Sequence, residues 1–118
     1  MLEVKIFTLY PDLFPGPLDI GIFKKAKENK IWNLKVINIR DYSKDNHGTV
    51  DDTPFGGGSG MLLRPDILAS ALDNNIKKGE KIIYLSPRGK KFDQNVARSL
   101  SKEKNLNLCL LYTSDAAD

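Results

Sequence analysis

The stretch Lys81-Ile82-Ile83-Tyr84-Leu85-Ser86-Pro87 decides the fold that this sequence predicts. It is short, rich in β-branched and aromatic residues, and ends at a proline, which is typical of a β-strand. Its apolar residues would fall on both faces of the strand, a pattern typical of parallel sheets that are covered on both sides. We therefore expect residues 81–87 to form a central, parallel strand, with Ile83 and Leu85 buried.

Three similar runs and three helical patterns surround this stretch. Strands are predicted over residues 4–10, 34–40 and 106–111, with Ile6 and Ile37 buried. Helices are predicted over residues 20–30, 65–76 and 93–104. The resulting order predicts an α/β fold, a mainly parallel sheet with helices on both faces.

Each predicted helix carries its own local signals. In the first, Ile22, Phe23, Ala26 and Ile31 have the spacing of an apolar face, and we interpret the lysines around them as a solvated face. Pro65 suits the first turn of the second helix. Asp93 suits the N-cap of the third.

Residues 41–60 show no helix or strand pattern and end in a glycine-rich run, Asp51-Asp52-Thr53-Pro54-Phe55-Gly56-Gly57-Gly58-Ser59-Gly60-Met61. A run of this kind is either a flexible linker or a backbone surface shaped for a ligand. Its acidic and Pro-Phe flank on one side and Met-Leu-Leu on the other favour a loop held at both ends. Its spacing fits neither a Walker loop nor a dinucleotide-binding turn. The single histidine, His47, precedes it and is either an ordinary surface residue or a substrate contact.

Composition narrows the class of protein. The chain has 118 residues, 41% of them hydrophobic, which fits one domain or part of one. A net charge of +3 permits a nucleic-acid partner without requiring one. The single cysteine, Cys109, excludes a disulfide within the chain. No apolar run approaches the roughly 20 residues of a membrane span, and the N-terminus enters a strand pattern at once, so we expect a cytoplasmic protein without a membrane partner.

A turn follows the strand over residues 81–87 at Ser86-Pro87-Arg88-Gly89. Ligands of open α/β sheets bind beyond the carboxyl ends of the strands. The turn is therefore a candidate ligand loop, although a plain strand-to-helix turn has the same composition.

Three pieces together resemble one family. They are Leu9-Tyr10-Pro11-Asp12-Leu13-Phe14, then the run from His47-Gly48-Thr49-Val50 through the glycine-rich stretch, then Tyr84-Leu85-Ser86-Pro87-Arg88-Gly89. In order and spacing they are similar to the N-terminal part of the bacterial tRNA (guanine-N1)-methyltransferases. The resemblance implies a SPOUT-class domain with a trefoil knot, a homodimer, and S-adenosyl-L-methionine as the methyl donor. No metal-binding residue is assigned. It implies methylation of N1 of the guanosine 3′-adjacent to the anticodon of tRNA, at position 37.

The resemblance also implies roles for individual residues. Donor binding is implied for Tyr84, Leu85, Ser86, Pro87 and Gly89. Contact with the target guanosine or its tRNA is implied for His47, Asp51, Gly58, Ser59 and Gly60.

The sequence departs from the family after residue 111. The glycine-rich segment that closes the donor site in the family is absent, so we expect residues 1–111 to be the N-terminal part of the domain, with the knot incomplete. We interpret residues 112–118 as a non-native tail and expect the C-terminal tRNA-binding domain to be absent. No catalytic residue is assigned, because the family's base and its arginine partner lie in the missing half, and we expect the chain alone to be inactive. The alternative is a non-catalytic RNA-binding α/β module that uses Lys90, Lys91 and the glycine loop, but that basic stretch lacks the exposed aromatic residues usual in such modules.

Overall fold

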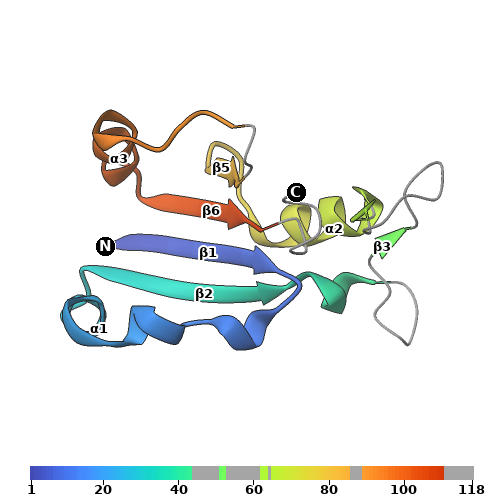
Figure 1. Cartoon of the computed structure of the whole chain (residues 1–118). Coiled ribbons are helices and arrows are strands. Elements are labelled where there is room, and N and C mark those ends of the chain that lie inside the picture. The colour runs from blue at the N-terminus through green and yellow to red at the C-terminus, as the bar shows by residue number, and fades with distance from the viewer. Residues whose placement is uncertain (44–50, 53–61, 64, 86–88, 111–118) are drawn as a thin grey trace.

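The computed structural model describes residues 1–43, 51–52, 62–63, 65–85 and 89–110 (Figure 1). Four strands form one sheet in the order β2-β1-β6-β5, and all three pairs are parallel. The strands are β1 (Leu2–Thr8), β2 (Trp32–Asn38), β5 (Lys81–Tyr84) and β6 (Asn105–Cys109). The predicted parallel sheet is confirmed.

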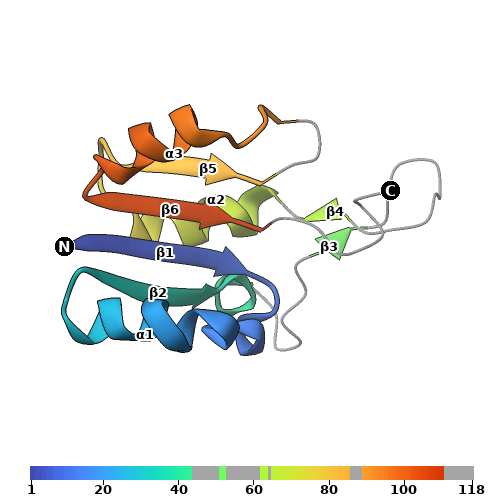
Figure 2. The ribbon, with the colours of Figure 1, turned by 60° about the vertical axis from the view of Figure 1, so that its left-hand side comes forward.

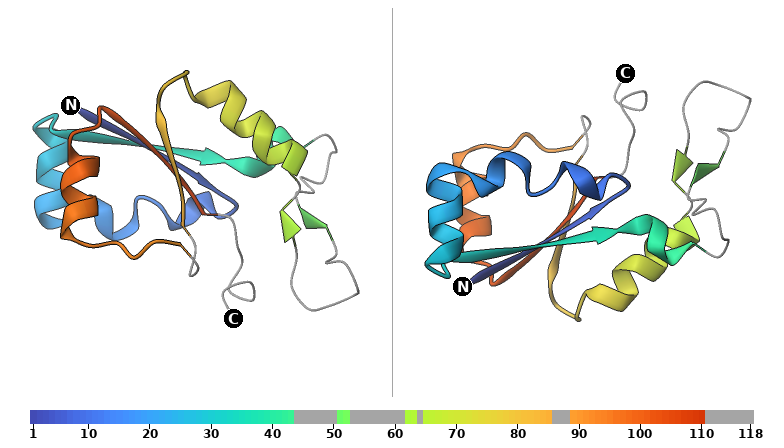
Figure 3. Two further views of the ribbon diagram at one scale, coloured as in Figure 1. Left: turned by 90° about the horizontal axis from the view of Figure 1, so that it is seen from above. Right: turned by 90° about the horizontal axis from the view of Figure 1, so that it is seen from below.

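Helices cover both faces of this sheet, as predicted. They are α1 (Gly21–Glu28), α2 (Pro65–Asn75) and α3 (Gln94–Ser101), with short 3₁₀ turns η1 (Pro11–Leu13), η2 (Gly16–Asp19) and η3 (Ile39–Tyr42). The connections through α1 and α3 step across the sheet in one direction, and the connection through α2 steps in the other. Right-handed crossovers therefore place α1 and α3 on one face and α2 on the opposite face, which Figure 3 shows. No helix in the described part of the chain is long and apolar enough to cross a bilayer.

The core lies between the sheet and α2. Phe7 pairs in register with Ile37 of β2 and with Cys109 of β6, so the three side chains point to the same face. They pack with Ile67 and Ala71 of α2 in one buried cluster. Burial raises the pKa of the Cys109 thiol to about 11, which keeps it protonated at neutral pH. The predicted burial of Ile6 and Ile37 is confirmed.

Strand β5 differs from its prediction in length and position. It ends at Tyr84 and lies at an edge of the sheet, where β6 is its one partner among the described strands, so the prediction of a central strand is wrong. Leu85 is 40% exposed instead of buried, and Ile83 is only half-buried. Apolar residues on both faces of a strand do not ensure that it is buried. At the edge of the sheet, β5 has a neighbouring described strand on one side, and its side chains stay exposed on the other.

Helix α1 also differs from its prediction. Ile22 is 77% exposed and Phe23 is 51% exposed, so the apolar spacing does not mark a buried face. Ala26 of the predicted apolar face is half-buried, and so is Lys27 of the predicted solvated face. The Phe23 carbonyl oxygen accepts a hydrogen bond from Trp32 Nε1 at 3.0 Å. Lys27 forms an ion pair with Asp19 at 3.7 Å and lies over the ring of Trp32.

The glycine-rich run is held at both ends, as its flanks predicted. Strand β3 (Asp51–Asp52) pairs antiparallel with β4 (Leu62–Leu63). Figure 2 shows this pair beyond the carboxyl ends of β1 and β6. The prediction of a stretch without secondary structure over residues 41–60 is therefore wrong for β3, and η3 extends into its beginning.

A polar cluster ties the connection between α2 and β5 to the sheet. Lys5 Nζ donates to the carbonyl oxygen of Asn75 at 2.9 Å and forms an ion pair with Glu80 at 3.4 Å. Asn107 Nδ2 donates to Glu80 Oε1 at 3.1 Å. Burial alone would raise the pKa of the Glu80 carboxyl, but hydrogen bonds from Asn107 and the Lys77 amide, with the charge of Lys5, hold it below its usual value of 4.5.

We expect Glu80→Gln to lower the free energy of unfolding by about 1–3 kcal/mol at neutral pH, because Lys5 loses its counter-charge in a partly buried site. Glu80 has a lowered pKa in the folded state, so its contribution is fully present above pH 4.5 and is lost as pH falls through the folded-state pKa. Urea unfolding at neutral and acid pH measures this, and the two proteins should converge on acidification. The exposed Glu28→Gln is the matched control; an equal loss in the control would refute the role of the cluster.

Candidate functional site

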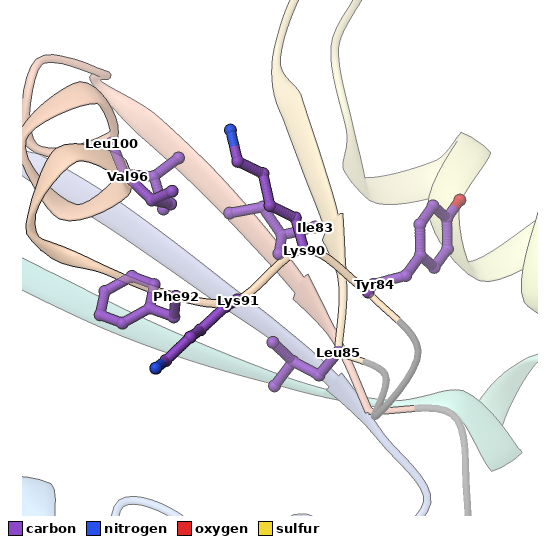
Figure 4. A pocket seen from close by; sticks show the side chains of 9 residues that line it. Ile83, Tyr84, Leu85, Lys90, Lys91, Phe92, Val96 and Leu100 are labelled. Atoms are coloured by element: carbon purple, nitrogen blue, oxygen red, sulfur yellow. The ribbon is translucent and has the colours of Figure 1, made fainter.

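A pocket opens beside the carboxyl end of β5, on the α3 face of the sheet (Figure 4). Its volume is about 590 Å³, within the range of roughly 300–1,000 Å³ typical of small-molecule sites. It is lined by Ile83, Tyr84, Leu85, Gly89, Lys90, Lys91, Phe92, Val96 and Leu100. We call it the β5 pocket.

Helix α3 forms one wall of the β5 pocket, and its local sequence explains its position. The Asp93 side chain accepts a hydrogen bond from the Val96 amide at 2.9 Å, which satisfies a free amide at the start of the helix. This confirms the predicted N-cap. Val96 and Leu100 then lie on one side of the helix, one turn apart, and both face the pocket. An apolar hollow of about 420 Å³ continues from there between α3 and the sheet, where Leu106 and Leu108 line it.

The chemistry of the β5 pocket combines an apolar lining with positive charge. Its aliphatic and aromatic side chains offer a surface for a flat or apolar group, and Lys90 and Lys91 offer two cations. None of its described lining residues is a carboxylate, so these side chains supply no acceptor for a proton. Among the described residues there is also no cluster of side chains that could hold a metal ion.

Three of the five predicted donor-binding residues line the β5 pocket. They are Tyr84, Leu85 and Gly89, while Ser86 and Pro87 lie outside the described residues. Tyr84 is 50% exposed, and Figure 4 shows its ring turned away from Phe92 and Leu100. Among the described residues, Leu85 and Gly89 are therefore the candidates to contact a ligand inside the pocket, Leu85 through its side chain and Gly89 through its backbone.

Of the predicted substrate residues, only Asp51 belongs to the described part of the chain. It lies in β3, where it pairs in register with Leu63. The other four, His47, Gly58, Ser59 and Gly60, lie outside the described residues. The arrangement of these residues around a substrate stays a prediction.

Sequence reasoning missed Phe92, Val96 and Leu100 as pocket residues. Phe92 is 68% exposed beside Lys91. The premise that the basic stretch lacks an exposed aromatic is therefore wrong. Val96 and Leu100 are four residues apart in the predicted helix 93–104, so they lie on the same face of it. A helix that returns over its own strand turns its apolar face toward that strand, and this is the signal that could have placed them in the pocket.

Comparison of the sequence with known proteins identifies the family to which it is similar. The family model described as tRNA (Guanine-1)-methyltransferase TrmD matches residues 2–113. A tRNA (guanine-N(1)-)-methyltransferase of Pelagibacter ubique (strain HTCC1062) is 64% identical over 108 residues, which are 92% of this chain and 47% of that protein.

Relatives with lower sequence identity are also tRNA (guanine-N(1)-)-methyltransferases. The protein of Wolbachia pipientis subsp. Culex pipiens (strain wPip) is 48% identical over 102 residues, 85% of this chain and 44% of its own length. That of Dictyoglomus turgidum (strain DSM 6724 / Z-1310) is 44% identical over 108 residues, 92% of this chain and 44% of its own length. The chain thus spans a little under half the length of these relatives.

Proposed function

The chain belongs to the tRNA (guanine-1)-methyltransferase family, and we propose that it is the donor-binding part of an enzyme that methylates N1 of guanosine 37 in tRNA. The proposed donor is S-adenosyl-L-methionine, and the proposed site is the β5 pocket. The observation that carries the proposal is that Leu85 and Gly89, from a motif similar to the donor loop of the family, line one pocket at the carboxyl end of a parallel strand.

The β5 pocket suits the donor in size and in the distribution of its chemistry. Its apolar side chains, Leu85 and Phe92 among them, offer a surface for the flat adenine ring. Lys90 and Lys91 favour the donor's carboxylate and disfavour its positively charged sulfonium. We therefore place the carboxylate toward the lysines and the sulfonium away from them.

The donor, when bound, supplies the methyl group that N1 of guanine takes up. The residues of this chain would bind and orient the donor, and a carboxylate must take the proton that N1 loses. Because the described lining of the β5 pocket contains no carboxylate, we propose that the acceptor comes from the part of the enzyme that this chain does not span. We further propose that the whole enzyme completes a SPOUT trefoil knot, forms a homodimer and acts in the cytoplasm.

The test uses a completed enzyme, residues 1–110 of this chain joined to the remainder of the Pelagibacter ubique relative. Titration calorimetry with S-adenosyl-L-methionine should show binding. Leu85→Asp should weaken that binding about tenfold or more, because it places a carboxylate on the apolar wall of the site. The change should leave the fold intact, since Leu85 is 40% exposed.

Leu13→Asp is the matched control, because Leu13 is 66% exposed in η1 and does not line the pocket. Its donor affinity should equal that of the unchanged enzyme. If Leu85→Asp bound the donor as well as this control, the donor site would lie elsewhere. A completed enzyme that bound tRNA but no donor would instead support the alternative function, a non-catalytic RNA-binding module.

A further inference from the structure

Positive charge is concentrated in one segment of the chain. Residues 77–104 hold nine of the 18 lysine and arginine residues but only three of the 15 acidic residues, a net charge of +6. The whole chain carries only +3, so the remaining residues are net negative. An asymmetry of this size indicates a surface for a negatively charged partner.

The described parts of this segment, residues 77–85 and 89–104, lie along one side of the sheet. They contain β5, which is at the edge of the described sheet, and α3, which lies beside β5 at the top of Figures 1 and 2. We call the surface of residues 77–85 and 89–104 the β5–α3 edge. It begins at the connection that precedes β5 and ends at the start of β6, so it runs the length of the sheet from the amino ends of the strands to the β5 pocket.

The acidic residues of the β5–α3 edge are all occupied within the protein. Glu80 accepts hydrogen bonds in the polar cluster with Lys5, Asp93 caps α3, and Glu103 forms an ion pair with Lys81 at 3.5 Å. Internal pairs therefore account for these negative charges and leave most of the positive charges facing solvent.

Three cations of the edge are exposed and have no ion pair among the described residues. Arg98 lies on α3, Lys102 follows its last turn, and Lys104 precedes β6. Lys102 and Lys104 border a polar hollow of about 340 Å³ with Lys78. A second polar hollow, of about 360 Å³, lies between Lys81 and Lys90. The cations thus flank a row of hollows that leads to the β5 pocket.

The chemistry of this surface fits a hydrated polyanion. The apolar residues of α3, Val96, Ala97 and Leu100, are half-buried and turned toward the pockets. The exposed residues of α3 are charged or polar, which disfavours insertion of this helix into a lipid surface. Exposed cations beside polar hollows are suited to the phosphates of a nucleic-acid backbone.

We propose that the β5–α3 edge binds the phosphodiester backbone of the RNA substrate and directs it toward the β5 pocket. The identity of the RNA rests on the proposed function, whereas the electrostatic argument does not. The contact is to phosphates, so it contributes affinity and orientation but no sequence selectivity.

The test compares two triple charge reversals in the completed enzyme. The edge variant is Arg98→Glu, Lys102→Glu and Lys104→Glu, none of which lines the β5 pocket. The control variant is Lys24→Glu, Lys25→Glu and Lys35→Glu, three exposed lysines on α1 and β2 with the same change in net charge. Fluorescence anisotropy with a labelled anticodon stem-loop RNA, over a series of KCl concentrations, gives Kd and its salt dependence.

The edge variant should bind the RNA about tenfold more weakly or worse, and the slope of log Kd against log salt should fall by about 2–3 because three phosphate contacts are lost. The control should stay within about threefold of the parent. Equal weakening in both variants, or no weakening in the edge variant, would overturn the proposal. So would an edge variant that lost binding to anionic phosphatidylglycerol vesicles but kept its RNA affinity.

Calorimetry with the donor separates this proposal from the proposed function. Both variants should bind S-adenosyl-L-methionine as the parent does. A parent that bound no donor would defeat the proposed function, while the comparison of RNA affinities would still decide the role of the edge.

Discussion

Phe7→Ala should lower the free energy of unfolding by about 3–5 kcal/mol. Phe7 is fully buried at the centre of the sheet, in register with Ile37 and Cys109 and packed against α2. Its removal leaves a cavity that the neighbouring strands cannot close, because their backbones are fixed by hydrogen bonds on both sides of β1. A domain of this size has a total stability of only about 5–15 kcal/mol, so most or all of it should be lost.

Urea unfolding followed by the fluorescence of Trp32, the single tryptophan, measures this change, with circular dichroism as a second probe. Phe92→Ala is the matched control, because Phe92 is 68% exposed, and it should change stability by less than about 0.5 kcal/mol. Equal losses for the two substitutions would show that the core does not lie between the sheet and α2.

The topology follows from features that are local in the sequence. Short apolar runs alternate with helical spacings, and a chain with that order has few arrangements other than a parallel sheet with right-handed crossovers. The buried positions Ile6 and Ile37 follow from the same pattern, because β1 and β2 are covered by helices. The Asp93 cap follows from a side chain acting on a backbone amide three residues away.

The position of β5 could not be predicted in this way. Whether a strand is central or at an edge depends on which strands pair beside it, and that depends on crossovers far away in the sequence. Ile82 and Tyr84 are 36% and 50% exposed, although they belong to a run as apolar as a central strand. The orientation of helix α1 could not be predicted either. The positions of Ile22 and Phe23 in the sequence do not determine which side of the helix faces the sheet.

The candidate site was predictable in part for a physical reason. A turn at the carboxyl end of a parallel strand identifies one wall of a ligand site, and the turn that ends at Gly89 was predicted in this way. Leu85, by contrast, was implied by the family resemblance alone. The opposite wall comes from Val96 and Leu100, which follow Leu85 by 11 and 15 residues in the sequence, and the return of α3 over β5 brings them together.

The 118-residue chain alone should methylate tRNA at less than about 10⁻⁴ of the rate of the completed enzyme. Methyl transfer requires the donor methyl and the target nitrogen to be held in line, and misplacement by about 1 Å can cost a factor of about 10². The described walls of the β5 pocket come from β5, α3 and the residues between them, and Phe92 and Leu85 in these walls are 68% and 40% exposed. A general base contributes a further factor of about 10²–10⁴, and the described lining of the pocket contains no carboxylate to act as one.

Transfer of tritium from labelled S-adenosyl-L-methionine to tRNA, followed by nucleoside analysis, measures both rates under the same conditions. A tRNA with adenosine at position 37 is the control for background transfer, and circular dichroism of the 118-residue chain establishes that it is folded when assayed. Methylated guanosine formed by the chain alone, well above that background, would contradict the prediction. It would mean that the β5 pocket positions the donor without further walls and that a proton acceptor lies within these 118 residues. The first candidate to substitute would then be Asp51, which belongs to β3, beyond the carboxyl ends of β1 and β6.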